Sequence, residues 1–287
     1  MFEFYIELKG EMIKILADLE RDIRVVKREF EREVSLPDKL VATSAGHNLF
    51  KGQGRSNRRF ILTPLLLISA KFGRYNFRKL KPVAVALELL DLAVGRHYAG
   101  TNIGERRAQP ETRNRKPENN LALICGDYYY AKALTLVSSL GDSQVIRILA
   151  EAIANIAEGE ALPGWPIGRG EHLPDDKSQS RLRGVRDWEK FYEKLRKKAS
   201  LYVASCRLGA LLAECSEEMI VAFSHFGQNA GLVCELVKEM YRVPEGEGLR
   251  LMEEARSFCE RAKEFLRVLP DNPYRDFLHH VIDTFLV

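Results

Sequence analysis

An apolar segment that ends in a histidine and is followed by an arginine pair is the part of the sequence best suited to chemistry. The stretch LELLDLAVGRHYAGTNIGERR runs from Leu87 to Arg107, and its first half is apolar like a buried helix. We interpret His97 as a packed or capping histidine and not as a catalytic base. The guanidinium groups of Arg106 and Arg107 suit a diphosphate, or equally ion pairs with nearby carboxylates. The residues between the histidine and the arginines include Tyr98, Ala99 and Asn102, and none of these three side chains is a carboxylate.

The overall composition is that of an ordinary globular protein, with 287 residues and a hydrophobic fraction of 46%. The net charge of +4 is too small to indicate nucleic-acid binding by itself, and aromatic side chains do not alternate with the basic ones. The five cysteines occur singly, without the spacing of a metal site, so we expect reduced thiols and a cytoplasmic location. No run of about 20 apolar residues and no signal peptide is found, so no transmembrane segment is expected.

Helical periodicity dominates the chain. Apolar residues recur at spacings of three and four, and no sustained alternation typical of strands is found. Several helices are apolar on more than one face, which indicates inner helices surrounded by others. The short Gly and Pro breaks are typical of turns, so the sequence predicts a single all-α domain over residues 1–287. The predicted helices span residues 12–32, 63–72, 81–94, 121–140, 143–160, 188–213, 216–242, 249–268 and 273–286.

Two polar connections interrupt these helices. Residues 45–60 include Arg58 and Arg59, and residues 163–188 are predicted to form a long polar loop. A loop of that length inside a compact domain is usually a functional lid, an interface or a disordered segment. Asp175 and Asp176 in this loop have no third carboxylate at helical spacing, so we interpret them as a solvated turn and not as a metal site.

The order of several motifs resembles that of the trans-isoprenyl diphosphate synthases, the polyprenyl synthetase family, across nearly the whole chain. The family has a helix ending E-x-x-H-x-A-x-x-x-H-D-D-x-x-D, followed by R-R and G-D-Y. The matching residues here are Glu88, Ala93, His97, Arg106, Arg107, Gly126, Asp127 and Tyr128. Later matches are EGE at 158–160, KKASLYVASCRLGA at 197–210 and GLVCELVKEMYR at 231–242. The resemblance implies a single-domain helical bundle of the isoprenoid synthase type, whose inner helices surround a central cavity.

The family's metal-binding positions carry other residues in this sequence. The resemblance implies that family members hold Mg²⁺ between two aspartate-rich helix ends, where the ions neutralise the leaving diphosphate. Here Glu235 stands where the family has a glutamine. The first motif has become Tyr98, Ala99 and Asn102, and the second has become Lys238, Glu239 and Arg242. We therefore predict no catalytic residue, no bound metal and no cofactor.

The family segment that grips isopentenyl diphosphate, G-G-K-R-x-R-P, has also changed. It corresponds to residues 58–64, with the sequence RRFILTP, in which only the proline of the motif, Pro64, is kept. Its cations are replaced by Phe60, Ile61 and Thr63. The resemblance still implies a set of candidate diphosphate-binding cations: Arg58, Arg59, Arg106, Arg107 and Lys197.

Three functions follow from this combination of a retained framework and lost carboxylates. The leading hypothesis is a catalytically inactive protein of isoprenoid biosynthesis that pairs, as a heterodimer or homodimer, with a competent prenyl diphosphate synthase. An alternative is an active prenyltransferase that uses Mg²⁺ at a non-standard site built on Asn102 and Glu239. The third is a protein that binds an anionic ligand, such as an isoprenoid diphosphate or a phosphorylated lipid. Nucleic acid is not an expected partner.

Overall fold

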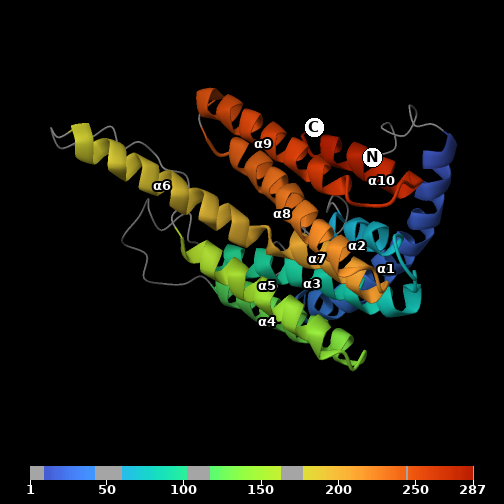
Figure 1. The fold of residues 1–287 in the computed structure, drawn as a ribbon. Helices are drawn as coiled ribbons and strands as arrows, with labels where there is room; N and C mark the ends of the chain where they lie inside the picture. The colour runs from blue at the N-terminus through green and yellow to red at the C-terminus, as the bar shows by residue number, and fades with distance from the viewer. Residues whose placement is uncertain (1–9, 43–59, 102–116, 163–176, 244, 287) are drawn as a thin grey trace. The chain divides into compact units, whose positions relative to one another are not determined.

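A computed structural model of the protein describes residues 10–42, 60–101, 117–162, 177–243 and 245–286 (Figure 1). Within these ranges the regular structure is α-helical and contains no strand, which confirms the predicted all-α class. The helices are α1 (Gly10–Ala42), α2 (Leu62–Ala70), α3 (Phe77–Thr101), α4 (Pro117–Ser138), α5 (Ser143–Ala161), α6 (Lys177–Lys198), α7 (Ser200–Leu212), α8 (Glu217–Met240), α9 (Glu245–Leu266) and α10 (Pro273–Thr284).

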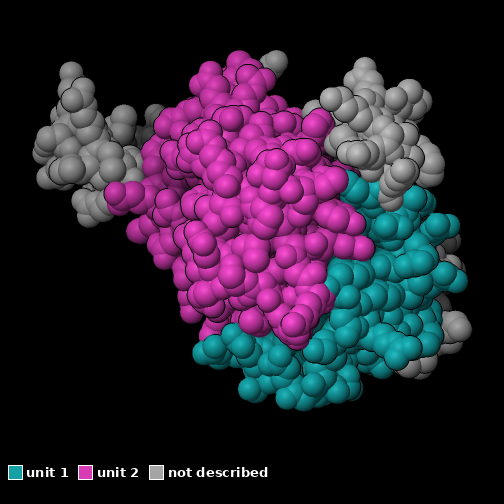
Figure 2. All heavy atoms as spheres, turned by 45° about the vertical axis from the view of Figure 1, so that its right-hand side comes forward, with its two compact units in different colours: residues 1–67, 75–147 teal, residues 68–74, 148–287 magenta. Residues whose placement is uncertain are grey.

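The chain divides into two compact units, which Figure 2 distinguishes by colour. The first unit consists of residues 1–67 and 75–147, and the second of residues 68–74 and 148–287. The organisation as one domain therefore stays a prediction.

In the first unit, α3 and α4 pack closely along their lengths. The central part of α3 is buried on nearly all sides, with Leu80, Leu87 and Leu90 at 1% exposure or less. Gly126 on α4 permits the close approach, since a Cβ there would lie only 2.2 Å from Cδ2 of His97. α1 adds a further layer through residues such as Phe30, whose ring meets Phe60 edge-on at 5.2 Å.

In the second unit, α8 makes extensive contacts with both α7 and α9 (Figure 1). Its N-terminus is capped by Ser216, whose Oγ accepts a hydrogen bond from the backbone N–H of Met219 at 3.3 Å. The side chains of Phe223 and Phe226 are fully buried. Gly227 lets α8 approach α7 closely, because a Cβ there would lie 2.7 Å from the carbonyl oxygen of Tyr202.

The helix predicted for residues 188–213 is in fact two helices, α6 and α7, separated at Ala199. No glycine or proline marks this break, so the sequence does not reveal it. α8 lies against the junction, where a Cβ on Gly231 would be 2.6 Å from Cβ of Ala199. α6 also begins at Lys177, inside the stretch predicted as a polar loop, because Lys, Gln, Arg and Leu at residues 177–182 are good helix formers.

The start of α3 also differs from the prediction. The helix begins at Phe77 rather than Lys81, because Oδ1 of Asn76 accepts a hydrogen bond from the backbone N–H of Arg78 at 3.1 Å. Pro82 consequently lies inside the helix, where it costs one backbone hydrogen bond, and not in the first turn. Among the described residues, no helix is both long enough and apolar enough to span a membrane.

Candidate functional site

The glutamate that matches the family motif on α3 has a structural role. Glu88 is 1% exposed, and its Oε1 accepts hydrogen bonds from the backbone N–H of Thr63 at 3.0 Å and from the Thr63 hydroxyl at 2.9 Å. The carboxylate thereby satisfies donors at the first turn of α2 and suits the positive end of that helix dipole. Thr63 occupies a position where the family has a diphosphate-binding arginine, and here the side chain is fully buried.

Replacing Glu88 with Leu should lower the free energy of unfolding by about 2 kcal/mol, because two buried donors on Thr63 lose a charged acceptor. Chemical denaturation followed by circular dichroism measures this loss. Thr63→Ser keeps both donors and is the matched control, with an expected change of less than about 1 kcal/mol. Equal stability of the Glu88→Leu variant and the unsubstituted protein would contradict the structural role of Glu88.

The histidine that precedes the first degenerate motif is held by α4. Nε2 of His97 lies 3.0 Å from Oδ1 of Asp127, and the ring packs over Gly126. Asp127 of the G-D-Y motif and His97 of the preceding motif are therefore in contact within the first unit. This arrangement positions the end of α3 on α4, which agrees with the expectation of a packed histidine.

The structure describes only part of the first degenerate motif and of the candidate diphosphate-binding cations. Tyr98 and Ala99 belong to the last turn of α3, and their side chains are not described. The remaining members, Asn102, Arg58, Arg59, Arg106 and Arg107, lie outside the described residues.

At the second degenerate motif, Lys238 on α8 and Arg242, two residues beyond the end of α8, each form an ion pair with a glutamate of that helix. Nζ of Lys238 lies 2.6 Å from Oε1 of Glu235, and Nη1 of Arg242 lies 2.8 Å from Oε1 of Glu239. Glu235 and Glu239 are buried, at 3% and 7% exposure. Each cation lies three residues after its carboxylate, a spacing that brings side chains together on one helical face. The positive charges of Lys238 and Arg242 are thus neutralised by glutamates of the same segment.

The pairing extends from α8 to the end of α6 and to α5, and we call these five residues the α5–α6–α8 ion-pair network: Glu160, Lys194, Lys198, Glu235 and Lys238. Lys198 joins the helices, with Nζ 3.3 Å from Oε2 of Glu235 and 3.4 Å from Oε1 of Glu160. Lys194 lies 3.6 Å from Oε2 of Glu160 and donates to the carbonyl oxygen of Leu162 at 3.1 Å. The sequence analysis did not predict the pairing of Glu160, Lys194 and Lys198, because long-range ion pairs leave no local pattern.

The ionisation of the network follows from burial and from its opposite charges. Burial alone would raise the pKa of Glu235, but Lys238 and Lys198 outweigh it and hold the pKa below the ordinary 4.5. Burial would also lower the pKa of Lys198, yet Glu235 and Glu160 raise it above its usual range. For Lys194 burial prevails over the attraction of Glu160, so the pKa is lowered. Glu235 and Lys198 therefore stay charged at neutral pH.

Lys197, the candidate diphosphate ligand that the structure describes, points to a different partner. Its Nζ lies 2.6 Å from Oε2 of Glu158, and this hydrogen bond raises the pKa of the lysine. Glu158 belongs to the EGE match on α5. The two family motifs are therefore joined by an ion pair within the second unit.

The described residues at the second motif do not fit a magnesium site. Mg²⁺ requires oxygen ligands in near-octahedral geometry, supplied in part by carboxylates. Here Glu239 is paired with Arg242, and Glu235 is paired with Lys198 and Lys238. Lys238 places an ammonium group where the family has a carboxylate. Across the described part of the chain, no three or more His, Cys, Asp or Glu side chains cluster as metal ligands would.

Comparison with known proteins finds similarity to one family. The model of the Polyprenyl synthetase family matches residues 104–241. Heptaprenyl diphosphate synthase component 2 of Geobacillus stearothermophilus is 29% identical over 229 residues, which are 80% of this chain and 65% of that protein. The Bacillus subtilis protein of the same name is 27% identical, over 77% of this chain and 59% of its own length. The chain thus spans less than two thirds of these relatives.

Solved structures agree on the fold. Geranylgeranyl pyrophosphate synthase from Corynebacterium glutamicum, complexed with calcium and isoprenyl diphosphate, superposes with a TM-score of 0.71 at 17% identity, over 95% of this chain and 96% of that one. A decaprenyl diphosphate synthase from Rhodobacter capsulatus gives 0.69 at 16% identity, over 95% and 98%. In its motifs, its helical fold and its sequence relatives, the chain is similar to the polyprenyl synthetase family, whose model matches residues 104–241.

Proposed function

We propose that this chain is a polyprenyl synthetase-like subunit without prenyl-transfer activity of its own, which assembles with a catalytically competent prenyl diphosphate synthase. The observation that carries the proposal is the internal neutralisation of the second motif. Lys238 and Arg242 stand at positions where the family has aspartates, and both are paired with glutamates of α8.

The chemistry of the family explains why this observation matters. An allylic diphosphate must lose its diphosphate to form a carbocation, and a divalent ion held by carboxylates stabilises the charge that develops on the leaving group. A lysine or arginine already bound to a buried carboxylate offers little net positive charge to a diphosphate. A point charge on one helix also cannot coordinate oxygens from two sides, as a metal ion does.

The relatives support the assembly part of the proposal. Two of them are named component 2 of a heptaprenyl diphosphate synthase, a name that implies at least one further component. A chain of this family that keeps its helical framework can keep an assembly surface while its reaction chemistry is lost. Its effect on a partner would then be on the partner's stability, rate or product chain length.

The test is incorporation of radiolabelled isopentenyl diphosphate into farnesyl diphosphate with excess Mg²⁺. We expect no product above background from the protein alone. Mixed with an aspartate-complete polyprenyl synthetase from the same source, it should change the rate or the product length, and the two should elute together in size-exclusion chromatography. Albumin in place of this protein is the control for non-specific stabilisation.

Each other result has a definite meaning. Product from the protein alone that is abolished by Glu239→Gln would contradict the proposal and support a prenyltransferase with a non-standard metal site. No product alone and no effect on the synthase would contradict the subunit role.

A further inference from the structure

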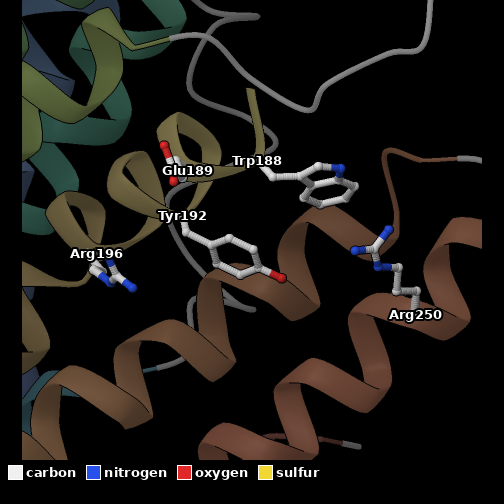
Figure 3. A pocket seen from close by; sticks show the side chains of 5 residues that line it. All are labelled: Trp188, Glu189, Tyr192, Arg196 and Arg250. Atoms are coloured by element: carbon white, nitrogen blue, oxygen red, sulfur yellow. The ribbon is translucent and has the colours of Figure 1, made fainter. Parts of the chain in front are cut away.

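A second feature of this protein is a pocket of about 380 Å³ in the second unit, lined by Trp188, Glu189, Tyr192, Arg196 and Arg250 (Figure 3). α6 supplies the first four residues and α9 supplies Arg250. The volume falls in the lower part of the range found for small-molecule sites, roughly 300–1,000 Å³. None of these residues belongs to the ion-pair network or to a family motif.

The aromatic wall of the pocket is built by helical spacing. Trp188, Tyr192 and Arg196 are four residues apart and therefore share one face of α6. The rings of Trp188 and Tyr192 lie 6.1 Å apart with 32° between their planes. Phe191, which is 1% exposed, meets both rings edge-on, at 5.8 Å from Trp188 and 5.7 Å from Tyr192. A buried residue thus holds the two aromatic surfaces in place.

The cations of this pocket differ from those of the second motif. The guanidinium of Arg250 stacks on the indole of Trp188, with its carbon 4.3 Å from the ring centroid, so that its N–H edges stay available. Among the described residues, neither Arg196 nor Arg250 forms an ion pair with a carboxylate. Both are exposed, whereas Arg242, Lys238 and Lys197 are paired.

The two guanidinium groups flank the aromatic wall. Trp188 and Arg196 are separated by about 12 Å along the axis of α6. Arg250 stands beside Trp188, while Tyr192 lies between this end and Arg196 in Figure 3. Glu189 adds a hydrogen-bond acceptor. Burial raises the pKa of the Tyr192 hydroxyl, and the charge of Glu254 adds to this effect, so the hydroxyl stays protonated.

We propose that this pocket binds a nucleoside phosphate, with its phosphates on Arg196 and its planar base along Tyr192 toward Trp188 and Arg250. A guanidinium fork matches phosphate oxygens in two simultaneous hydrogen bonds, and aromatic faces stack on the base. The N–H edges of Arg250 donate to acceptors of the base. Glu189 accepts from an amino or hydroxyl group of the base or sugar. The site is independent of whether the chain transfers prenyl groups.

The first experiment is isothermal titration calorimetry of the full chain with ADP, adenosine and inorganic pyrophosphate. ADP should bind with a dissociation constant below about 1 mM, and adenosine and pyrophosphate each at least about tenfold more weakly. Arg196→Gln should weaken ADP binding at least about tenfold and remove its advantage over adenosine. Arg250→Gln should weaken ADP and adenosine alike.

Matched controls come from the same two helices. Lys190→Gln on α6 and Arg256→Gln on α9 each remove one exposed positive charge outside the pocket. Both should keep ADP affinity within about twofold of the unsubstituted protein, since screened surface charges act weakly. All substituted positions are exposed, so the variants should fold, which circular dichroism verifies.

A second readout places the ligand. The chain has two tryptophans, Trp165 and Trp188, so a Trp165→Phe variant reports on the pocket alone. ADP should change Trp188 fluorescence with the same affinity that calorimetry gives. Absence of saturable binding up to roughly 5 mM ADP would overturn the proposal. So would an ADP affinity of Arg196→Gln and Arg250→Gln equal to that of the unsubstituted protein. Pyrophosphate binding as tightly as ADP would overturn its nucleoside part.

Discussion

The Glu235→Gln variant should unfold with a free energy roughly 3 kcal/mol below that of the unsubstituted protein, because a buried charge pair loses one partner. Glu235 is 3% exposed and contacts two ammonium groups, Lys238 at 2.6 Å and Lys198 at 3.3 Å. Glutamine keeps the size of the side chain but offers no charge. Lys198, itself largely buried, then keeps Glu160 as its one close carboxylate partner among the described residues. Urea denaturation at neutral pH measures the difference.

The pH dependence of this difference follows from the lowered pKa of Glu235. A carboxyl group whose pKa is lower in the folded state stabilises the fold above its unfolded pKa, here 4.5. That contribution disappears as the pH falls through the folded pKa. The stability difference between the unsubstituted protein and Glu235→Gln should therefore be constant near neutral pH and shrink below pH 4.5.

The control is an exposed pair of the same chemistry on α9. Glu260 pairs with Lys263 at 2.9 Å, and its side chain is 72% exposed. Glu260→Gln should change the free energy of unfolding by less than about 1 kcal/mol, because solvent screens the pair. A double-mutant cycle with Lys238→Met isolates the coupling of Glu235 to Lys238. If Glu235→Gln and Glu260→Gln had equally small effects, the ion-pair network would have no structural importance.

The second large effect is expected where α8 crosses α7. Gly227→Ala should destabilise the protein by about 3 kcal/mol, the upper range for overpacking a dense interior. The added Cβ would lie 2.7 Å from the carbonyl oxygen of Tyr202 and 3.0 Å from Cα of Val203. These are backbone atoms, so relief requires the helices to separate. Thermal unfolding followed by circular dichroism measures the loss.

Gly95→Ala on α3 is the matched control. A Cβ there has no atom within 4 Å, and the residue is exposed in the helix interior. Alanine should stabilise the protein by roughly 0.5–1 kcal/mol through its better helix propensity. Opposite signs for the two Gly→Ala changes are therefore expected. A neutral Gly227→Ala variant would show that α7 and α8 do not pack as closely as described.

Helix periodicity and motif order were sufficient to predict the helical class and the similarity to the polyprenyl synthetase family. Apolar spacing of three and four residues is a local property, and it located α5, α8 and α10 within about three residues of their observed ends. The motifs were recognised because they occur in a fixed order along the chain. The loss of carboxylates at positions 98, 99, 102, 238 and 242 was likewise visible from residue types alone.

The predicted helix boundaries failed where one specific contact decides the structure. The break at Ala199 has no sequence marker and lies where Gly231 of α8 packs against it. The start of α3 was missed because the cap by Asn76 outweighed the usual first-turn preference of Pro82. Both are cases in which one specific contact overrides a general propensity.

The sequence by itself determined which helices form, which family they resemble and which carboxylates are missing. Tertiary structure alone decided which side chains of other helices pair with the residues around those positions. The partners of Glu235 and Glu239 three residues away were available from spacing, but Lys198 and Glu160 came from other helices. Periodicity records which face of a helix is buried and not which neighbour meets it. Ion pairs and pockets depend on that neighbour, so they are fixed only when the helices pack.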